Sequence, residues 1–242
     1  MFSLPLIVAA NSPALADFKV RYPTVVEREL EIESYSDRSF DGRATKSNAQ
    51  SHNFEVGYGV TGWWQPELEV ELAKEPQGDL KYNALTLENR FQLLPQGEYW
   101  LDLGVFAEYS RARLHDAPDE MTIGPLAQKQ FGNTLHTLNL LFTRQVGQSR
   151  ENGTFFQYAW QSKWLWKPQL EPGFEVFGDP GKLGHFGKAS DQDHRIGPSL
   201  SGGFLLPQGS GKLKYEVGYL IGVTDAAASG VAKLQLEYEL FF

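Results

Sequence analysis

The final segment of the chain constrains its fold more than any other feature. Between Leu234 and Phe242 apolar residues occupy every second position, and Gln235, Glu237 and Glu239 lie between them. An alternation with a period of two predicts a β-strand with one apolar face and one polar face. In a soluble sheet, the apolar face of such a strand would need a second layer of structure to cover it.

Similar alternation recurs along most of the chain, whereas helical periodicity is nearly absent. The clearest segments are 52–63, 98–113, 154–166 and 211–223, and the central parts of their apolar faces carry no Asp, Glu, Lys or Arg. A two-sheet sandwich is one interpretation, but its strands average about five or six residues. Strands that cross a bilayer are longer, at roughly 9–11 tilted residues, and fit these segments better. We therefore predict an all-β fold, a transmembrane antiparallel up-and-down β-barrel.

The connections between the segments indicate the topology. Short Pro-Gln-Gly turns at 95–97 and 207–209, and Trp-x-Pro turns at 64–66 and 166–168, fit a periplasmic rim with aromatic side chains at the headgroup level. Longer connections fall between them and are expected to face outward. Termini on one side of the membrane require an even number of strands, so a weak segment at 119–128, which contains Pro125, is counted as a strand.

This gives about twelve strands, although ten or fourteen stay open. The expected strands are 25–37, 52–63, 67–75, 80–93, 98–113, 119–128, 134–146, 154–166, 170–178, 194–206, 211–223 and 229–242.

Composition excludes several classes of protein. The 242 residues include no cysteine, which excludes a disulfide framework and thiolate metal sites and suits a protein of the cell envelope. A formal charge of −8 argues against a nucleic-acid partner, because phosphates require a basic surface. No segment after residue 16 approaches the roughly 18 apolar residues of a membrane-spanning helix.

The first 24 residues are expected to lie outside the barrel wall. Residues 1–16 are uncharged and end in Ala14-Leu15-Ala16, which predicts a cleaved secretory signal peptide. No Lys or Arg precedes the apolar run, so Met1 is expected to be internal to a longer precursor. Residues 17–24 are expected to form a short periplasmic lead or a partial plug, and 25–242 the barrel.

Several short motifs resemble a known bacterial group. Residues 98–109, 171–175, 196–198 and 236–239 are similar to segments of proteobacterial outer-membrane proteins, a group that resembles the channel proteins associated with phenol-degradation pathways. The resemblance implies a β-barrel in the outer membrane of a Gram-negative bacterium. A last strand that stops on Phe also resembles the terminal strand by which such barrels are recognised for assembly. The residues implied in this signal are Tyr238, Leu240 and Phe242.

The polar faces of the strands provide the candidate functional residues. We predict a passive channel, or porin, for small solutes, whose acid-rich wall mildly favours cations. Its expected partners are the lipid bilayer, the outer-membrane assembly machinery and small solutes, with no cofactor and no metal. The candidate lumen residues are Glu31, Glu33, Glu55, Glu69, Glu71, Glu88, Arg90, Asp102, Glu108, Lys163, Arg195, Lys214 and Glu216, and the candidate membrane-interface aromatics are Trp63, Trp64, Trp164 and Trp166.

Three alternatives accompany this interpretation. The first is a structural or partner-recruiting barrel whose lumen is blocked, because twelve strands lie between filled eight-stranded barrels and open porins. The second is a lipid-modifying enzyme, but the nearest histidines, His136 and His194, lack the motif context of a catalytic site. The third is a metal site in the expected outer loop 179–193, whose donor spacing matches no known pattern. This loop is expected to fold inward and narrow the mouth.

Overall fold

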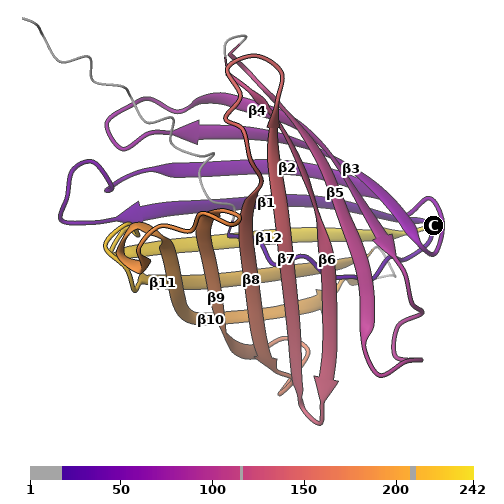
Figure 1. Ribbon diagram of the computed structural model, residues 1–242. Helices are drawn as coiled ribbons and strands as arrows, with labels where there is room; N and C mark the ends of the chain where they lie inside the picture. Colours follow the sequence, from indigo (N-terminus) through magenta and orange to yellow (C-terminus); the bar gives the residue numbers. More distant parts are fainter. Residues whose placement is uncertain (1–17, 115–116, 208–210) are drawn as a thin grey trace, which may run out of the picture.

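A computed structural model describes residues 18–114, 117–207 and 211–242. Over these residues the chain forms twelve strands and one short 3-10 helix, at Ala189–Asp191. The strands wrap around a common axis into a single wall (Figure 1). Their bounds are β1 Glu29–Phe40, β2 Gln50–Tyr58, β3 Trp64–Lys74, β4 Lys81–Gln92, β5 Asp102–Ala112, β6 Asp119–Phe131, β7 Thr134–Val146, β8 Phe155–Trp164, β9 Glu171–Lys182, β10 Asp193–Leu205, β11 Lys212–Gly222 and β12 Gly230–Phe241.

Each strand pairs antiparallel with its neighbours in sequence, and β1 pairs with β12 to close the ring. The closing register runs from Glu29 opposite Phe241 to Phe40 opposite Gly230. Closure pairs the edges that an open sheet would leave exposed. The predicted twelve-stranded barrel is therefore confirmed, including the weak strand around Pro125, which lies in β6. In the described part of the chain, no helix has the length and apolar character needed to cross a bilayer.

Side chains on the wall follow the alternation of the sequence. Outward positions such as Phe54, Val56 and Ile123 are exposed apolar residues, each at least half accessible. Inward positions such as Glu55 and Glu88 are polar and buried. This arrangement is the reverse of a soluble barrel and suits a wall that faces hydrocarbon.

Several expected strand boundaries differ from those of the structure, and two of the differences have a clear local cause. The first strand begins at Glu29, not at residue 25, because Arg28 adopts a left-handed backbone conformation with φ of 63° and turns the chain. The ninth strand continues to Lys182, although Pro180 and Gly181 look like a turn. The register with β8 shifts here: Asp179 and Pro180 of β9 lie opposite the single residue Gln157, so β9 bulges and accommodates the proline.

The barrel has two different ends. We call the end that holds the C-terminus the terminal mouth; its connections within the described chain are 59–63, 93–101, 132–133, 165–170, 206–207 and 211. We call the opposite end the loop mouth; its connections are 41–49, 75–80, 113–114, 117–118, 147–154, 183–192 and 223–229. The predicted signal peptide, 1–16, lies outside the described residues.

Candidate functional site

The inside of the barrel is occupied by the chain's own N-terminal residues. Residues 18–25, here called the lumen segment, run through the interior before the turn at Arg28 leads into β1 (Figure 1). Phe18, Lys19, Val20 and Arg21 are all at least nine-tenths buried. Residues 18–24 therefore lie inside the barrel wall, as expected of a partial plug, and the periplasmic location of residues 17–24 stays a prediction.

The start of the lumen segment is anchored near the middle of the barrel. The backbone N–H of Phe18 donates to the hydroxyl of Tyr35 at 2.5 Å, and Lys233 Nζ donates to the Phe18 carbonyl at 2.8 Å. The Phe18 ring contacts Phe177 edge-on at 5.5 Å, and the guanidinium of Arg195 lies over the same ring at 4.8 Å. This residue is therefore held by polar bonds from its backbone and by apolar contacts from its side chain.

Two cations of the lumen segment face the carboxylates of the wall. Lys19 Nζ lies 2.6 Å from Glu55 and 3.3 Å from Glu33. Arg21 Nη2 lies 3.0 Å from Glu88 on β4. The carboxylate of Glu108 on β5 is 3.9 Å from the same guanidinium. Buried charges are stable only when they are paired, so the segment neutralises the acid-rich side of the lumen.

A side chain of β7 binds the backbone of the lumen segment from both sides. The Arg21 N–H donates to Asn139 Oδ1 at 2.8 Å, and Asn139 Nδ2 donates to the Arg21 carbonyl at 2.7 Å. Asn139 is fully buried. This pair of bonds imitates the pairing between neighbouring strands and recognises the peptide unit, whatever side chain it carries.

The opposite side of the lumen neutralises its own charges. Lys233 Nζ lies 3.0 Å from both Glu175 and Glu216. The side chains of Lys233 and Glu175 are completely buried. Gln161 Nε2 donates to the same two carboxylates at 2.7 Å. Tyr22 of the lumen segment joins this network by donating to Gln161 Oε1 at 2.9 Å. The charges on this side therefore pair with one another, and Tyr22 links the lumen segment to them.

The lumen segment separates two cavities. A cavity of about 480 Å³ opens at the loop mouth, has Phe18 on its wall, and carries five carboxylates against Lys46 and Arg195. Those carboxylates belong to Asp37, Glu75, Asp179, Asp191 and Asp193. A second cavity of about 150 Å³ lies toward the terminal mouth and is lined by residues 19–22 together with acids of β1, β3 and β12. Both cavities are therefore acid-rich.

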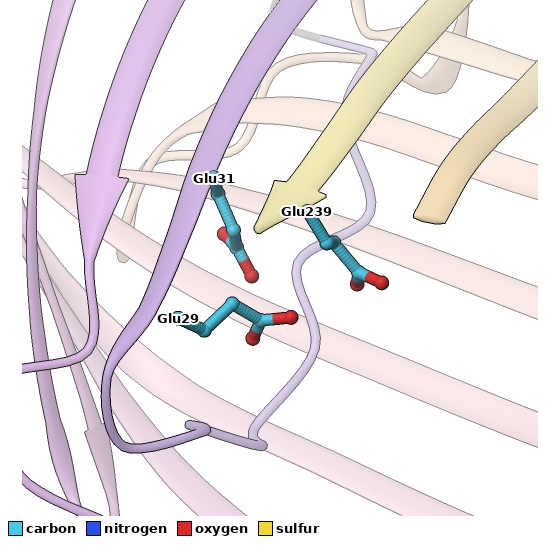
Figure 2. Close-up of side chains that lie close together, drawn as sticks. All are labelled: Glu29, Glu31 and Glu239. Carbon is cyan, nitrogen blue, oxygen red and sulfur yellow. The ribbon is translucent and has the colours of Figure 1, made fainter. Parts of the chain in front are cut away.

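Three of these acids gather beside the seam between the first and last strands. Glu29 and Glu31 of β1 and Glu239 of β12 converge, with one carboxylate oxygen of each within 4.8 Å of the others (Figure 2). Basic and amide groups already surround them: Arg90 Nη2 lies 2.9 Å from Glu31, and Lys214 forms an ion pair with Glu239. The cluster contributes negative potential at the terminal mouth.

All of the predicted lumen residues lie on inward positions of the wall, but they differ in environment. Asp102 lies beside a turn, where its carboxylate accepts the N–H of Gly97 at 2.7 Å. Glu71 accepts a bond from Asn83 at 2.7 Å, and Glu69 lies beside it on β3, half-buried. The fully or nearly buried members are Glu31, Glu33, Glu55, Glu88, Lys163, Arg195 and Glu216, and the partly exposed members are Arg90, Glu108 and Lys214.

Sequence reasoning missed the partners of these acids. Lys19 and Arg21 lie before the first expected strand, and Asn139 is one polar residue between Leu138 and Leu140 of β7. The alternation Phe-Lys-Val-Arg-Tyr at 18–22 is a signal of an extended chain with a basic face, and it could have been matched to the acidic wall.

The tryptophans predicted at the membrane interface and the residues of the predicted assembly signal lie at the terminal mouth. Trp63 stacks on Phe91 at 6.3 Å, and Trp164 stacks on Trp166 at 5.8 Å. Trp64 is less exposed because its Nε1 donates to Asn89 Oδ1 at 3.1 Å. At the end of the chain, Tyr238 and Leu240 take outward positions of β12, and Phe242 is exposed just beyond it.

The donors considered for the alternative metal site are used in other contacts. Asp193 pairs with Arg195 at 2.6 Å, and His194 bonds to Tyr158 at 3.1 Å and to Gln192 at 2.7 Å. The connection itself spans only 183–192, because residues 179–182 belong to β9. Asp191 lines the cavity at the loop mouth, so the connection borders that cavity.

Two connections at the loop mouth are fastened together. Arg43 donates to Asp41 at 2.8 and 2.7 Å and to the carbonyls of Asp225 and Ala227 at 2.7 and 2.8 Å. The N–H of Ser229 donates to Asp41 at 2.8 Å. The hydrogen bonds from Arg43 hold the pKa of the Asp41 carboxyl well below its usual range. Residues 41–49 are therefore docked on 223–229, above the seam of the barrel.

Comparison with known proteins identifies the fold. No protein-family model and no curated protein matches the chain. An outer membrane channel from Pseudomonas putida F1 is similar over 96% of this chain and 100% of its own, with a TM-score of 0.58 and 11% identity. The KdgM porin is similar over 88% of this chain and 99% of its own, with a TM-score of 0.53 and 8% identity. At such identities the likeness shows the fold alone, and the association with phenol degradation stays a prediction.

Proposed function

We propose that the chain is an outer-membrane channel for small solutes, and that the lumen segment closes it. The fold is that of bacterial outer-membrane channels, and apolar side chains cover the outside of the wall. The observation that carries the proposal is the pair of acid-rich cavities, one at each mouth, separated by a single extended segment.

The lumen segment is suited to move because it is not part of the wall. It hydrogen-bonds to side chains such as Tyr35, Asn139 and Gln92, and none of the twelve strands pairs with it in the described structure. Its withdrawal would leave every strand-to-strand hydrogen bond in place. A barrel of twelve strands is wider than the filled barrels of eight strands, so the emptied lumen is expected to hold water.

A permanently blocked barrel is the second candidate, and the buried ion pairs of Lys19 and Arg21 favour it. Removing one partner of a buried pair is costly, on the order of 3–5 kcal/mol, because the other charge stays buried without compensation. The two candidates therefore differ in whether the segment leaves the lumen under ordinary conditions.

Conductance in planar bilayers separates the two candidates. Lys19→Gln with Arg21→Gln removes the ion pairs of the segment, so we expect step-like currents that are at least tenfold more frequent than in the unaltered protein. Arg150→Gln with Lys188→Gln removes the same charge from exposed connections and serves as the matched control. Folded protein that carries no current in any of these forms would overturn the channel and favour the blocked barrel.

A further inference from the structure

We infer that the lumen is a binding site for a short extended peptide with basic side chains two residues apart, and that the lumen segment is its built-in occupant. The inference rests on the proposed channel function and adds the class of solute. It follows from the contacts of the wall with residues 18–22, because the wall binds both the backbone and the side chains of these residues, as a peptide-binding protein does.

Successive residues of the lumen segment contact opposite sides of the wall, as in an extended chain. Lys19 and Arg21 point to carboxylates on β1, β2, β4 and β5. Phe18 and Val20 belong to an apolar cluster that includes Phe177 and Leu220, on the side of β9 and β11. Tyr22 bonds to Gln161 on β8. The lumen thus has a basic-residue side and an apolar side.

The backbone contact gives the site its preference for a peptide. Asn139 donates to one backbone carbonyl and accepts from the N–H of the same residue, which requires an amide unit on each side of that residue. A linear polyamine offers charges but no such pair of groups. The two hydrogen bonds of Asn139 therefore favour a peptide over a cation that has no backbone amides.

The acidic side has capacity beyond its present contacts. Glu55, Glu67 and Glu88 are buried and bring one carboxylate oxygen each within 4.8 Å of the others. Glu88 Oε2 is buried without a hydrogen-bond partner in the described part of the chain, although Glu88 Oε1 binds Arg21. A cation that enters the lumen would pair with these carboxylates, whose buried charges need a partner.

Exchange of occupants avoids the cost of an empty site. When the lumen segment leaves, Glu33, Glu55, Glu88 and Glu108 lose the ion pairs described above. A solute that carries two cations at the same spacing restores those pairs. The acid-rich cavities at both mouths would concentrate such a solute before it reaches the site.

The test is block of potassium current through the Lys19→Gln/Arg21→Gln variant. The probe is the tripeptide Lys-Val-Arg, acetylated and amidated so that its ends add no charge. We expect it to block at a concentration at least tenfold below that of the neutral peptide Gln-Val-Gln. Spermidine is the third probe and measures what charge alone contributes.

Three channel variants make the test specific to the site. Glu55→Gln with Glu88→Gln is expected to raise the blocking concentration of Lys-Val-Arg at least tenfold, whereas Asp79→Asn with Glu98→Gln, in exposed connections, leaves it unchanged. Asn139→Leu is expected to weaken the tripeptide several-fold and to leave spermidine unchanged. If the double Glu variant does not fold, as judged by its β-sheet circular dichroism, Glu88→Gln alone replaces it with an expected change of about threefold.

The outcomes are distinguishable. No current in the Lys19→Gln/Arg21→Gln variant would defeat the channel itself. Current with equal block by the charged and neutral tripeptides would overturn the peptide site and leave the channel standing. Block by spermidine and Lys-Val-Arg that is equally insensitive to Asn139→Leu would show a general cation site, and would also overturn the inference.

Discussion

At the scale of single residues, Asn139 is the side chain on which the position of the lumen segment most depends. It is fully buried and supplies both partners for the backbone of Arg21. A side chain that cannot hydrogen-bond would leave a buried N–H and a buried carbonyl unsatisfied, at roughly 1–3 kcal/mol for each group. Few positions in the wall combine such burial with two bonds to a segment outside the sheet.

We therefore expect Asn139→Ala to expose the lumen segment. The chain has no cysteine, so Val20→Cys introduces a single thiol at a position that is 3% exposed. Its reaction with a water-soluble thiol reagent should be slow, and Asn139→Ala should accelerate it at least tenfold. His136→Ala, on the same strand but near the terminal mouth, is the control. An unchanged rate in Asn139→Ala would mean that the ion pairs hold the lumen segment without the hydrogen bonds of Asn139.

Asp41 is the second residue with a single clear role, because it joins two connections at the loop mouth. Its pKa is lowered mainly by the hydrogen bonds from Arg43. A carboxyl whose pKa is lower in the folded state stabilises the fold at pH values above its ordinary pKa of about 4. That contribution is lost only as the pH falls through the lowered value.

We expect hydrogen-exchange protection of residues 41–49, corrected for intrinsic rates, to be the same at pH 5 and pH 7. Asp41→Asn should reduce this protection and speed tryptic cleavage after Arg43 and Lys46 several-fold. Asp79→Asn, in the exposed connection 75–80, should have no effect on either measurement. Protection that already falls between pH 7 and pH 5 would contradict the role given to Asp41.

At the scale of elements, the sixth strand shows how closely the wall is packed. Gly124 faces inward, and a Cβ atom placed there would lie 1.9 Å from the carbonyl oxygen of Leu140 on β7. Pairing between β6 and β7 skips this position and resumes at Leu126 opposite Asn139. The glycine thus permits a close approach next to Pro125, which cannot donate a ladder hydrogen bond.

Gly124→Ala is expected to destabilise the barrel by about 1–3 kcal/mol, because the two strands must separate locally. The change should appear as a lower temperature or denaturant concentration for loss of the folded form. Gly42→Ala is the matched control, since a Cβ atom at Gly42 has no neighbour within 4 Å. Equal stability of the two variants would show that β6 and β7 adjust without cost.

The elements differ in how far the sequence predicted them. Period-two alternation located the strands because one side of each strand meets hydrocarbon and the other meets polar groups. The boundary at Arg28 and the bulge at Pro180 depend on backbone conformation and on a neighbouring strand, which local pattern does not encode. The plug over 18–24 depends on contacts between residues more than a hundred positions apart, such as Arg21 with Asn139.

The candidate site was predictable only in part for the same reason. The acids Glu33, Glu55 and Glu88 stand out as polar residues on alternating strands, so their inward placement follows from the pattern. Their cationic partners come from the lumen segment, and nothing in the strands signals which cations those are. In the structure, Lys19 and Arg21 of the lumen segment pair with Glu33, Glu55 and Glu88.

At the scale of the whole molecule, the net charge of −8 and the acid-rich cavities predict the selectivity of the open channel. Fixed carboxylates attract cations over about 10 Å at 0.1 M salt and over about 3 Å at 1 M salt. We expect the reversal potential in a potassium chloride gradient to show cation preference that declines as the salt is raised. Glu69→Gln with Glu71→Gln should reduce it further, and Glu98→Gln should not. A reversal potential that changes neither with salt nor with Glu69→Gln and Glu71→Gln would show that the wall carboxylates do not set the selectivity.

The seam between β1 and β12 has a consequence for folding. It joins Glu29 to Phe241, the two ends of the wall, so its contacts have the largest sequence separation in the barrel. Contacts of this kind form late, because the entropy of closing so long a loop must be overcome before they give any stability. Until then β1 and β12 both present unpaired edges, which are prone to aggregate. A ribosome that stalls before residue 230 would release a chain with no means of sealing itself, and such a product is expected to be degraded.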